Sequence, residues 1–322
     1  MRLRRGLTAT AALAAVATWG ARRYPRFRPY TLLLSRASVL PPDARAGVQK
    51  WLFKAVYDTM NLLMRRSDVG FLNYGYSPIE TGLDPLELPP EIEPDRYSIQ
   101  LYDKVAGAID LGGLDVLEVG CGRGGGAAFI FERRGPRTMT GVDLSTSSIA
   151  YCRRRYARPG LSFHVADAEK LPFPAASFDA ILNVESSHCY PDVERFFTEV
   201  ARVLRPGGVF LFADLRHTTL ATARGGPKVG DVPKLREEIE AAGLVVVGEQ
   251  DITANVVRAL ELDSPRRREL IERTAPRPLR AQLLDFAGVE GSGLHRALVA
   301  GQVTYLCMTL RPAADAVEPA AA

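Results

Sequence analysis

An apolar run that passes directly into a turn of glycines constrains the fold of this chain more than any other feature. Residues 114–119 form the apolar run, Gly120, Gly122 and Gly124 form the turn, and residues 127–133 continue with a helical pattern. Glycine adopts positive φ readily and carries no Cβ, so the backbone of such a turn can approach a ligand closely. The helix that follows offers free N–H groups at its start. The stretch therefore predicts a strand, a tight turn and a helix that grip a nucleotide-like cofactor.

Two kinds of cofactor fit this turn. Its glycines satisfy the spacing G-x-G-x-x-G, and Asp143 lies where a dinucleotide-binding fold places the acid that binds the ribose. The glycine spacing alone therefore does not exclude a nicotinamide dinucleotide as the cofactor. Glu118 stands two residues before the first glycine. Together with three later blocks, this acid favours a different cofactor.

The three further blocks follow in order along the chain. They are Gly141-Val142-Asp143-Leu144-Ser145, residues 167–173 with the sequence DAEKLPF, and residues 204–208 with the sequence LRPGG. In combination with the glycine turn, they resemble the class I S-adenosylmethionine-dependent methyltransferases over residues 102–216. The resemblance rests on four blocks in the order of that family, which is far more specific than the glycine turn alone.

The resemblance implies which residues hold S-adenosylmethionine. In that family the glycine turn lies under the methionine part, and the acid that ends the second strand binds both ribose hydroxyls. The acid after the third strand accepts a hydrogen bond from the adenine amino group, and the next residue lends a backbone N–H. Asp143, Asp167 and Ala168 match these positions. The implied cofactor residues are Glu118, Gly120, Gly122, Gly124, Asp143, Leu144, Asp167, Ala168 and Asn183.

Short β-type runs alternate with helical patterns from residue 101 onward. Such alternation predicts an α/β fold with a mostly parallel sheet and helices on both faces. The resemblance makes this a Rossmann-like class I methyltransferase fold with seven strands, in which the last two are antiparallel. The expected strands are residues 115–119, 138–143, 161–165, 178–184, 209–213, 244–250 and 302–310. The expected helices include residues 145–156, 232–242 and 192–204, the last closed by Pro206-Gly207-Gly208.

The remaining segments divide around this core. We expect an Arg- and Ala-rich extension at residues 1–42, a lid region at 43–100, the methyltransferase domain at 101–311, and a disordered tail at 312–322. The lid region contains an amphipathic helix at 50–66, followed by an aromatic loop at 71–76 and a proline-rich passage. A mostly helical insertion at about 253–284 interrupts the domain. The loop and the insertion are where acceptor specificity is expected, because the cofactor occupies the sheet.

Charge and cysteine usage exclude several classes of function. The net charge of +4 is misleading, because eight arginines precede the first acid, Asp43, and residues 43–322 carry −4. This body shows no basic stripe interleaved with aromatic residues, so we expect a small-molecule acceptor and no nucleic-acid substrate. The four cysteines are scattered without a C-x-x-C pair, which predicts no zinc or other metal site and suits a reducing cytoplasm.

The N-terminal residues 1–28 place an Ala-rich apolar run, 6–20, between arginines. The run is too short to span a bilayer, since a spanning helix needs about 20 apolar residues. It predicts either a signal-like or transit-like segment or a helix that lies on a membrane surface, so that a cytoplasmic protein would contact the membrane peripherally. A poorly ordered extension is the alternative. A homodimer is a further hypothesis that the sequence leaves open.

Methyl transfer requires a base only when the acceptor has a proton to lose. The base is expected after the fourth strand, where His188 titrates near neutrality and can take a proton from a hydroxyl. A helix cap or loop packing is its alternative role. Glu185 would orient the imidazole or line the methionine end of the cofactor, or remain a solvated carboxylate. Asp214 would orient His188 or a substrate hydroxyl, or pair with Arg216.

Asn73, Tyr74 and Tyr76 resemble the aromatic lid of small-molecule methyltransferases, in which a tyrosine closes over the cofactor. An aromatic packing cluster is the alternative. With the segments around His188 and Asp214, they most resemble the phthiotriol and phenolphthiotriol dimycocerosate O-methyltransferases and related natural-product enzymes. The sequence thus predicts methyl transfer to an oxygen of a small apolar acceptor, such as a lipid, polyketide or other secondary metabolite. Carboxyl or carbon methylation is the alternative, and an NAD-dependent oxidoreductase or a non-enzymatic binding module is more remote.

Overall fold

The computed structural model describes residues 42–63, 69–80, 86–219 and 230–315. The N-terminal segment 1–28, with its predicted membrane contact, lies outside these residues, as does the end of the helix predicted at 50–66. No helix within the described ranges combines the length and the apolar character needed to cross a membrane.

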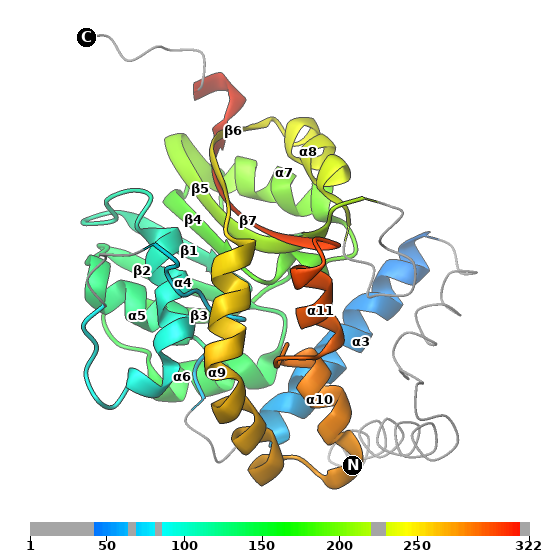
Figure 1. The fold of residues 1–322 in the computed structure, drawn as a ribbon. Coiled ribbons are helices and arrows are strands. Elements are labelled where there is room, and N and C mark those ends of the chain that lie inside the picture. The colour runs from blue at the N-terminus through cyan, green and yellow to red at the C-terminus, as the bar shows by residue number, and fades with distance from the viewer. Residues whose placement is uncertain (1–41, 64–68, 81–85, 220–229, 316–322) are drawn as a thin grey trace, which may run out of the picture.

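The core is a seven-stranded sheet with the strand order β3-β2-β1-β4-β5-β7-β6 (Figure 1). Strands β1 to β5 are parallel, and β7 runs antiparallel to both of its neighbours. This confirms the predicted Rossmann-like class I methyltransferase fold. The strands are β1 Asp115–Val119, β2 Thr138–Asp143, β3 Leu161–Val165, β4 Phe178–Val184, β5 Leu204–His217, β6 Leu244–Asp251 and β7 Val303–Pro312.

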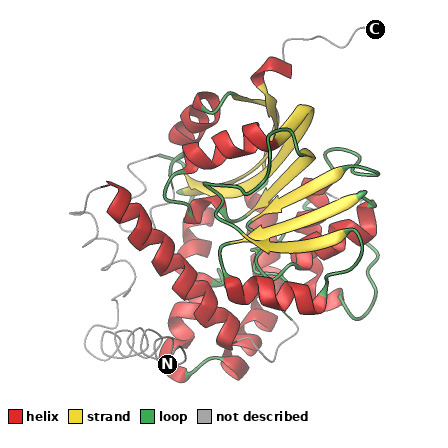
Figure 2. Ribbon diagram, turned by 180° about the vertical axis from the view of Figure 1, so that it is seen from behind, coloured by secondary structure: helices red, strands yellow, loops and turns green. Residues whose placement is uncertain are grey.

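Helices cover both faces of the sheet (Figure 2). One face carries an apolar cluster that includes Ile99, Ile130 and Leu260, and the other carries a cluster with Phe197 and Ile239. Burial on both faces is what a parallel sheet requires, and it accounts for the long apolar runs of the central strands β4 and β5. The helices are α3 Pro42–Leu63, α4 Arg96–Ala106, α5 Gly125–Arg134, α6 Thr146–Arg155, α7 Val193–Val203, α8 Val232–Ala241, α9 Thr253–Thr274, α10 Arg280–Phe286 and α11 Gly293–Val299.

Strand β5 is longer than the expected 209–213. It starts at Leu204, directly after α7, so Pro206-Gly207-Gly208 lies in an irregular part of the strand and not in a loop. At its other end, antiparallel pairing with β7 continues to the pair His217 and Val303. Asp214 therefore lies within the strand and not at its carboxyl end. The sequence did not show this, because the pairing partner is nearly 90 residues away.

Three predicted boundaries also change. The division between residues 100 and 101 falls inside α4, which packs against the sheet as part of the core. The helical insertion runs beyond 284, because α11 continues it to Val299. The expected disordered tail begins too early: β7 reaches Pro312, and a 3-10 turn, Ala313–Asp315, is held by the Asp315 carboxylate, which accepts a hydrogen bond from the Gly207 N–H at 2.8 Å. Residues 316–322 lie outside the described chain.

Helix α3 packs on the side of the sheet where the glycine turn lies. Its Asn61 side chain donates to Ser148 Oγ of α6 at 2.7 Å and accepts from the Arg123 guanidinium at 3.0 Å. Asn61 is buried, so these bonds form without competition from water. They fix α3 against both α6 and the glycine turn.

Candidate active site

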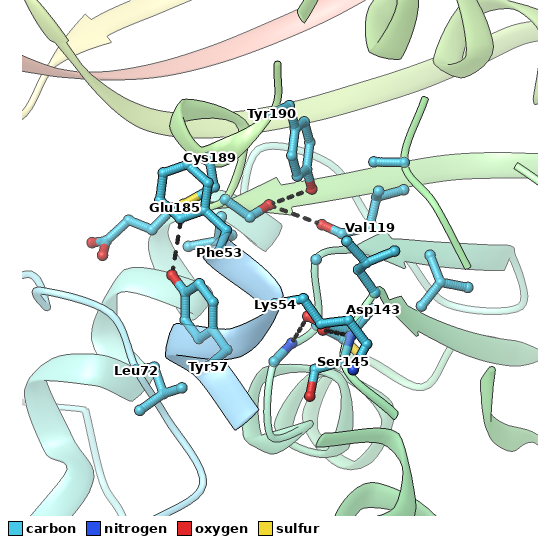
Figure 3. Close-up of a pocket in the computed structure, with 18 of the residues that line it drawn as sticks. Phe53, Lys54, Tyr57, Leu72, Val119, Asp143, Ser145, Glu185, Cys189 and Tyr190 are labelled. Carbon is cyan, nitrogen blue, oxygen red and sulfur yellow. Dashed lines mark hydrogen bonds between the residues drawn. The ribbon is translucent and has the colours of Figure 1, made fainter. Parts of the chain in front are cut away.

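A pocket with about 990 Å³ of empty space, part of it open to solvent, lies at the carboxyl ends of the parallel strands and is covered by α3 (Figure 3). This is where ligands bind in open α/β sheets. We call it the first cavity. Of the predicted site residues, Gly120, Gly122, Asp143, Leu144, Asp167, Ala168, Glu185 and Asn73 line it.

The glycine turn adopts the conformation that its sequence predicts. Gly120 has φ +78°, Gly122 has φ +52° and Gly124 has φ +79°. A Cβ on Gly120 would lie 2.1 Å from Ser186 Oγ, so only glycine fits there. Gly124 does not reach the first cavity, because a Cβ there would meet Cys152 and Phe163 beneath the turn.

Asp143 presents a carboxylate that is pre-oriented by the backbone. Its Oδ2 accepts a hydrogen bond from the Gly122 N–H at 3.0 Å, and its Oδ1 accepts one from the Ser145 N–H at 2.8 Å. Burial raises the pKa of Asp143 to about 6, although these two backbone bonds lower it. Each carboxylate oxygen has a second lone pair for a ligand hydroxyl. The arrangement fits a pair of ribose hydroxyls.

Lys50 of α3 is a residue at the cavity that the sequence interpretation missed. Its Nζ lies 2.6 Å from Asp167 Oδ2 and 2.6 Å from Glu169 Oε2. Phe53, Lys54 and Tyr57 from the same helix also line the cavity. The spacing i, i+3, i+4, i+7 places these four residues on one helical face. This spacing was visible in the sequence, but the sequence did not show which part of the protein this face of the helix would cover.

Two predicted cofactor residues lie behind the cavity wall. Glu118 is fully buried and accepts a hydrogen bond from the Tyr102 hydroxyl at 2.6 Å, and burial raises its pKa to about 7. The Asn183 amide donates to Val119 O at 3.0 Å and to Ser186 Oγ at 2.7 Å. Neither side chain lines the cavity. Asn183 thus holds the end of β1 directly before the glycine turn, whereas Glu118 is bonded to α4 through Tyr102.

His188 and Asp214 form a hydrogen-bonded pair. His188 Nδ1 lies 2.7 Å from Asp214 Oδ1, and Asp214 Oδ2 accepts from the Ser187 hydroxyl and the His188 N–H at 2.5 and 3.0 Å. Arg216 approaches Oδ2 at 3.2 Å. Of the predicted roles for Asp214, orienting His188 and pairing with Arg216 are therefore both present. His188 lies beside the first cavity without lining it, and 17% of its side chain is exposed.

The electrostatics of this pair favour opposite charges. Burial by itself raises the pKa of Asp214, but His188 and Arg216 more than offset this effect and hold the pKa well below its ordinary value. Burial lowers the pKa of His188, but Cys189 and Asp214 more than compensate, so its pKa lies well above its ordinary value. The pair thus holds a proton on the imidazole more tightly than a free histidine does.

Glu185 does not orient the imidazole by a hydrogen bond, contrary to one of its two expected roles. Its carboxylate accepts from the Tyr74 N–H at 2.8 and 3.0 Å and from the Tyr305 hydroxyl at 2.8 Å. Burial raises its pKa to about 7. Its φ of +51° is in the left-handed region, which is costly for a non-glycine residue and is typical of functional sites. Glu185 ties the segment around Tyr74 to the end of β4.

The expected aromatic lid is only partly at the cavity. Asn73 lines it, but Tyr74 and Tyr76 do not. Tyr76 is 7% exposed and belongs to the core, as in the alternative of a packing cluster. Tyr57 of α3 is a tyrosine that does line the cavity, with its Oη 3.7 Å from Cys189 Sγ (Figure 3).

Metal-ligand side chains do not gather in this part of the protein. Across the described ranges, no group of three or more His, Cys, Asp or Glu side chains is arranged to hold a metal ion. The four cysteines are unpaired thiols.

The fold and the cavity are those of the class I S-adenosylmethionine-dependent methyltransferases. A family profile described as a methyltransferase domain matches residues 117–212. The chain is 39% identical to the phthiotriol/phenolphthiotriol dimycocerosates methyltransferase of Mycobacterium tuberculosis, over 81% of this chain and 93% of that protein. The chain belongs to this family, and its cofactor is S-adenosylmethionine. The nicotinamide alternative is therefore set aside.

Two further similarities extend this assignment. The chain is 43% identical to a fatty-acid O-methyltransferase of Mycolicibacterium smegmatis, over 70% of this chain and 78% of that protein. Among solved structures, a cyclopropane synthase from Mycobacterium tuberculosis matches with a TM-score of 0.61 and 19% identity, over 79% of this chain and 95% of that one. At that identity the structural match shows the fold alone.

Proposed function

We propose that this methyltransferase acts on a hydroxyl oxygen of an apolar, lipid-like acceptor, with His188 as the base. The hydrogen-bonded pair of His188 and Asp214 beside the first cavity is the observation that carries this proposal. The names of the two relatives support the acceptor class, since one refers to phthiotriol and phenolphthiotriol dimycocerosates and the other to fatty acids.

The cofactor would bind along the strand ends. In this proposal the Asp143 carboxylate accepts hydrogen bonds from both ribose hydroxyls. The Asp167 carboxylate accepts one from the adenine amino group, and the N–H of Ala168 donates one to the adenine ring. Leu144 lines the same wall, and Gly120 and Gly122 pass under the methionine part. The ammonium group of Lys50 already contacts Asp167 Oδ2, so adenine would share this carboxylate with the lysine. Bound S-adenosylmethionine supplies a methyl group on a sulfonium, which is already an activated leaving group.

The residues of the chain would then align the acceptor and move its proton. Nδ1 of His188 donates to Asp214, which leaves Nε2 to accept the hydroxyl proton of the acceptor. The buried Asp214 stabilises the imidazolium that forms, and Arg216 and Ser187 keep Asp214 ionised and fixed. Because Asp214 orients one nitrogen of the ring, the other nitrogen is directed at a single position.

Methylation of a carboxylate is the second candidate, and the raised pKa of His188 favours it. A carboxylate is ionised at neutral pH and needs no base. A protonated His188 would then pair with the carboxylate and position it. The 43% identity to a fatty-acid O-methyltransferase supports the same reaction.

One experiment separates the two candidates. The protein receives methyl-labelled S-adenosylmethionine with 1-dodecanol, a 4-alkylphenol or a long-chain fatty acid, and the products are treated with mild alkali. Label on 1-dodecanol that survives alkali means an ether, because this acceptor has no nucleophilic carbon, and it supports the hydroxyl reaction. Label released as methanol means an ester and supports the carboxylate reaction. Absence of transfer to every member of the panel contradicts the proposed acceptor class.

Residues 1–28 carry a separate proposal, namely a peripheral contact of a cytoplasmic protein with anionic membranes. The apolar run between arginines supports it. Co-sedimentation of the full chain with anionic and neutral vesicles tests it, and equal binding to both contradicts the electrostatic part. A homodimer is likewise proposed, and sedimentation equilibrium of the full chain tests that state.

A further inference from the structure

A second cavity, with about 800 Å³ of empty space of which part is open to solvent, adjoins the first. It lies between the end of α3, the segment around Phe71, and helices α9 and α10. Most of its wall is apolar. The apolar lining residues are Met60, Val69, Phe71, Leu72, Leu270, Ile271, Ala275, Leu283, Phe286 and Ala287. Nothing in the proposed cofactor arrangement uses this space.

The two cavities share a wall. Phe71, Leu72 and Asn73 line both of them. The next residue, Tyr74, lines the second cavity and donates its N–H to Glu185, which lines the first. A ligand in the second cavity is therefore one residue layer away from the cofactor space.

Helix α3 shows which end of the first cavity faces the second. Its Lys50 contacts Asp167 at the proposed adenine end, whereas Met60, ten residues further along, lines the second cavity. Ten residues of α-helix span about 15 Å. The second cavity therefore lies well away from the adenine end. An acceptor there would approach the first cavity from the side of Phe71.

The two arginines at the second cavity are already neutralised. Asp263 accepts hydrogen bonds from both, at 2.6 and 2.9 Å from Arg266 and 2.8 Å from Arg267, and a second carboxylate, that of Asp95, lies 3.2 Å from Arg266. Arg267 also donates to the carbonyl oxygens of Ala287, Asn73 and Tyr74. With their charge compensated, these side chains do not form a binding site for a carboxylate. The cavity therefore fits an uncharged apolar group.

Resting on the proposed function, we propose that the second cavity holds the alkyl chain of the acceptor, while the reacting oxygen lies at the shared wall. Phe286 supports this role, because 40% of this large apolar side chain is exposed while it lines the cavity. A bound alkyl chain would cover it and remove apolar surface from water.

The test measures binding and not turnover. Calorimetry with S-adenosylhomocysteine present gives the Kd of a series of 1-alkanols from 1-hexanol to 1-dodecanol. Each added methylene should lower Kd about three- to fourfold until the cavity is filled. Leu283→Trp fills the cavity, so it should raise the Kd of 1-dodecanol at least about tenfold. The chain length beyond which Kd stops falling should also become shorter. The variant should leave the Kd of S-adenosylhomocysteine unchanged.

Ala281→Trp is the matched control, since Ala281 is exposed on the same helix and does not line the cavity. Leu270→Phe provides a second filling variant from α9. The proposal is overturned if the filling variants bind 1-dodecanol as the control does, or if Kd does not depend on chain length. Chain-length-dependent binding without methyl transfer would instead contradict the proposed function and leave the alkyl site in place.

Discussion

Nδ1 of His188 lies 2.7 Å from Oδ1 of Asp214, although 26 residues separate them in the sequence. His188 belongs to a 3-10 turn after β4, and Asp214 lies within the neighbouring strand β5. The register of these parallel strands pairs Val184, the last residue of β4, with Ala213, so Asp214 lies beside the point where β4 ends. Asp214 is buried against Arg216, so it holds the imidazole in one orientation before any acceptor binds.

His188→Ala removes the proposed base. With a hydroxyl acceptor, we expect kcat to fall about 10²- to 10⁴-fold, the usual contribution of a general base. The Kd of S-adenosylhomocysteine, measured by calorimetry, should stay unchanged because His188 does not line the first cavity. His164→Ala, an exposed histidine on β3, is the control. Normal turnover in His188→Ala would remove the base from the mechanism.

The pH dependence of turnover should distinguish the acceptors. A base must be neutral, and the pKa of His188 lies well above its ordinary value because Cys189 and Asp214 outweigh the effect of burial. Methylation of an alkanol should therefore increase with pH beyond neutrality and level off only above the raised pKa. Methylation of a fatty acid should decrease over the same range, because the positioning imidazolium is lost. A flat kcat profile for the alkanol contradicts the assignment of His188.

Asp143→Ala should weaken cofactor binding. Hydrogen bonds to a charged group contribute about 1.5–3 kcal/mol, so the Kd of S-adenosylhomocysteine should rise about 10- to 100-fold. Because Asp143 also accepts from the Gly122 N–H, the thermal midpoint of each variant is measured alongside. Asp143→Asn retains a neutral acceptor and should bind with intermediate affinity. Glu132→Gln, exposed on α5, is the control, and equal affinity in all four proteins contradicts the ribose assignment.

Glu118 should make the cofactor-free protein less stable as the pH rises. Burial raises its pKa from 4.5 to about 7, so folding favours the protonated form. Its stabilising contribution is complete below about pH 4.5 and is lost as the pH rises through about 7. Glu118→Gln removes this titration and retains an acceptor for the Tyr102 hydroxyl. The thermal midpoint of the variant should therefore exceed that of the wild type at pH 8 but not at pH 4.5. Parallel pH curves would show that Glu118 does not titrate in this range.

Local patterns were sufficient for most of the sheet. The bounds of β1 to β4 agree with the prediction, because each of these strands is a short β-type run bounded by turn residues. The prediction was wrong for the ends of β5, which depend on pairing with β4 and β7 and not on the composition of the strand itself. Antiparallel pairing extends β5 to His217, past the point where the local pattern ends.

The sequence alone determined the fold class, the glycine turn, and the position of His188 after the fourth strand, because each follows from short-range pattern and strand order. Only the tertiary structure decided which side chains face the cofactor. Lys50 reaches Asp167 across 117 residues, and Glu118 and Asn183 turn away from the cavity although they flank its turn. The periodicity of a sequence shows on which face of its own helix or strand a side chain lies. The residue that this side chain contacts depends on how separate helices and strands pack together.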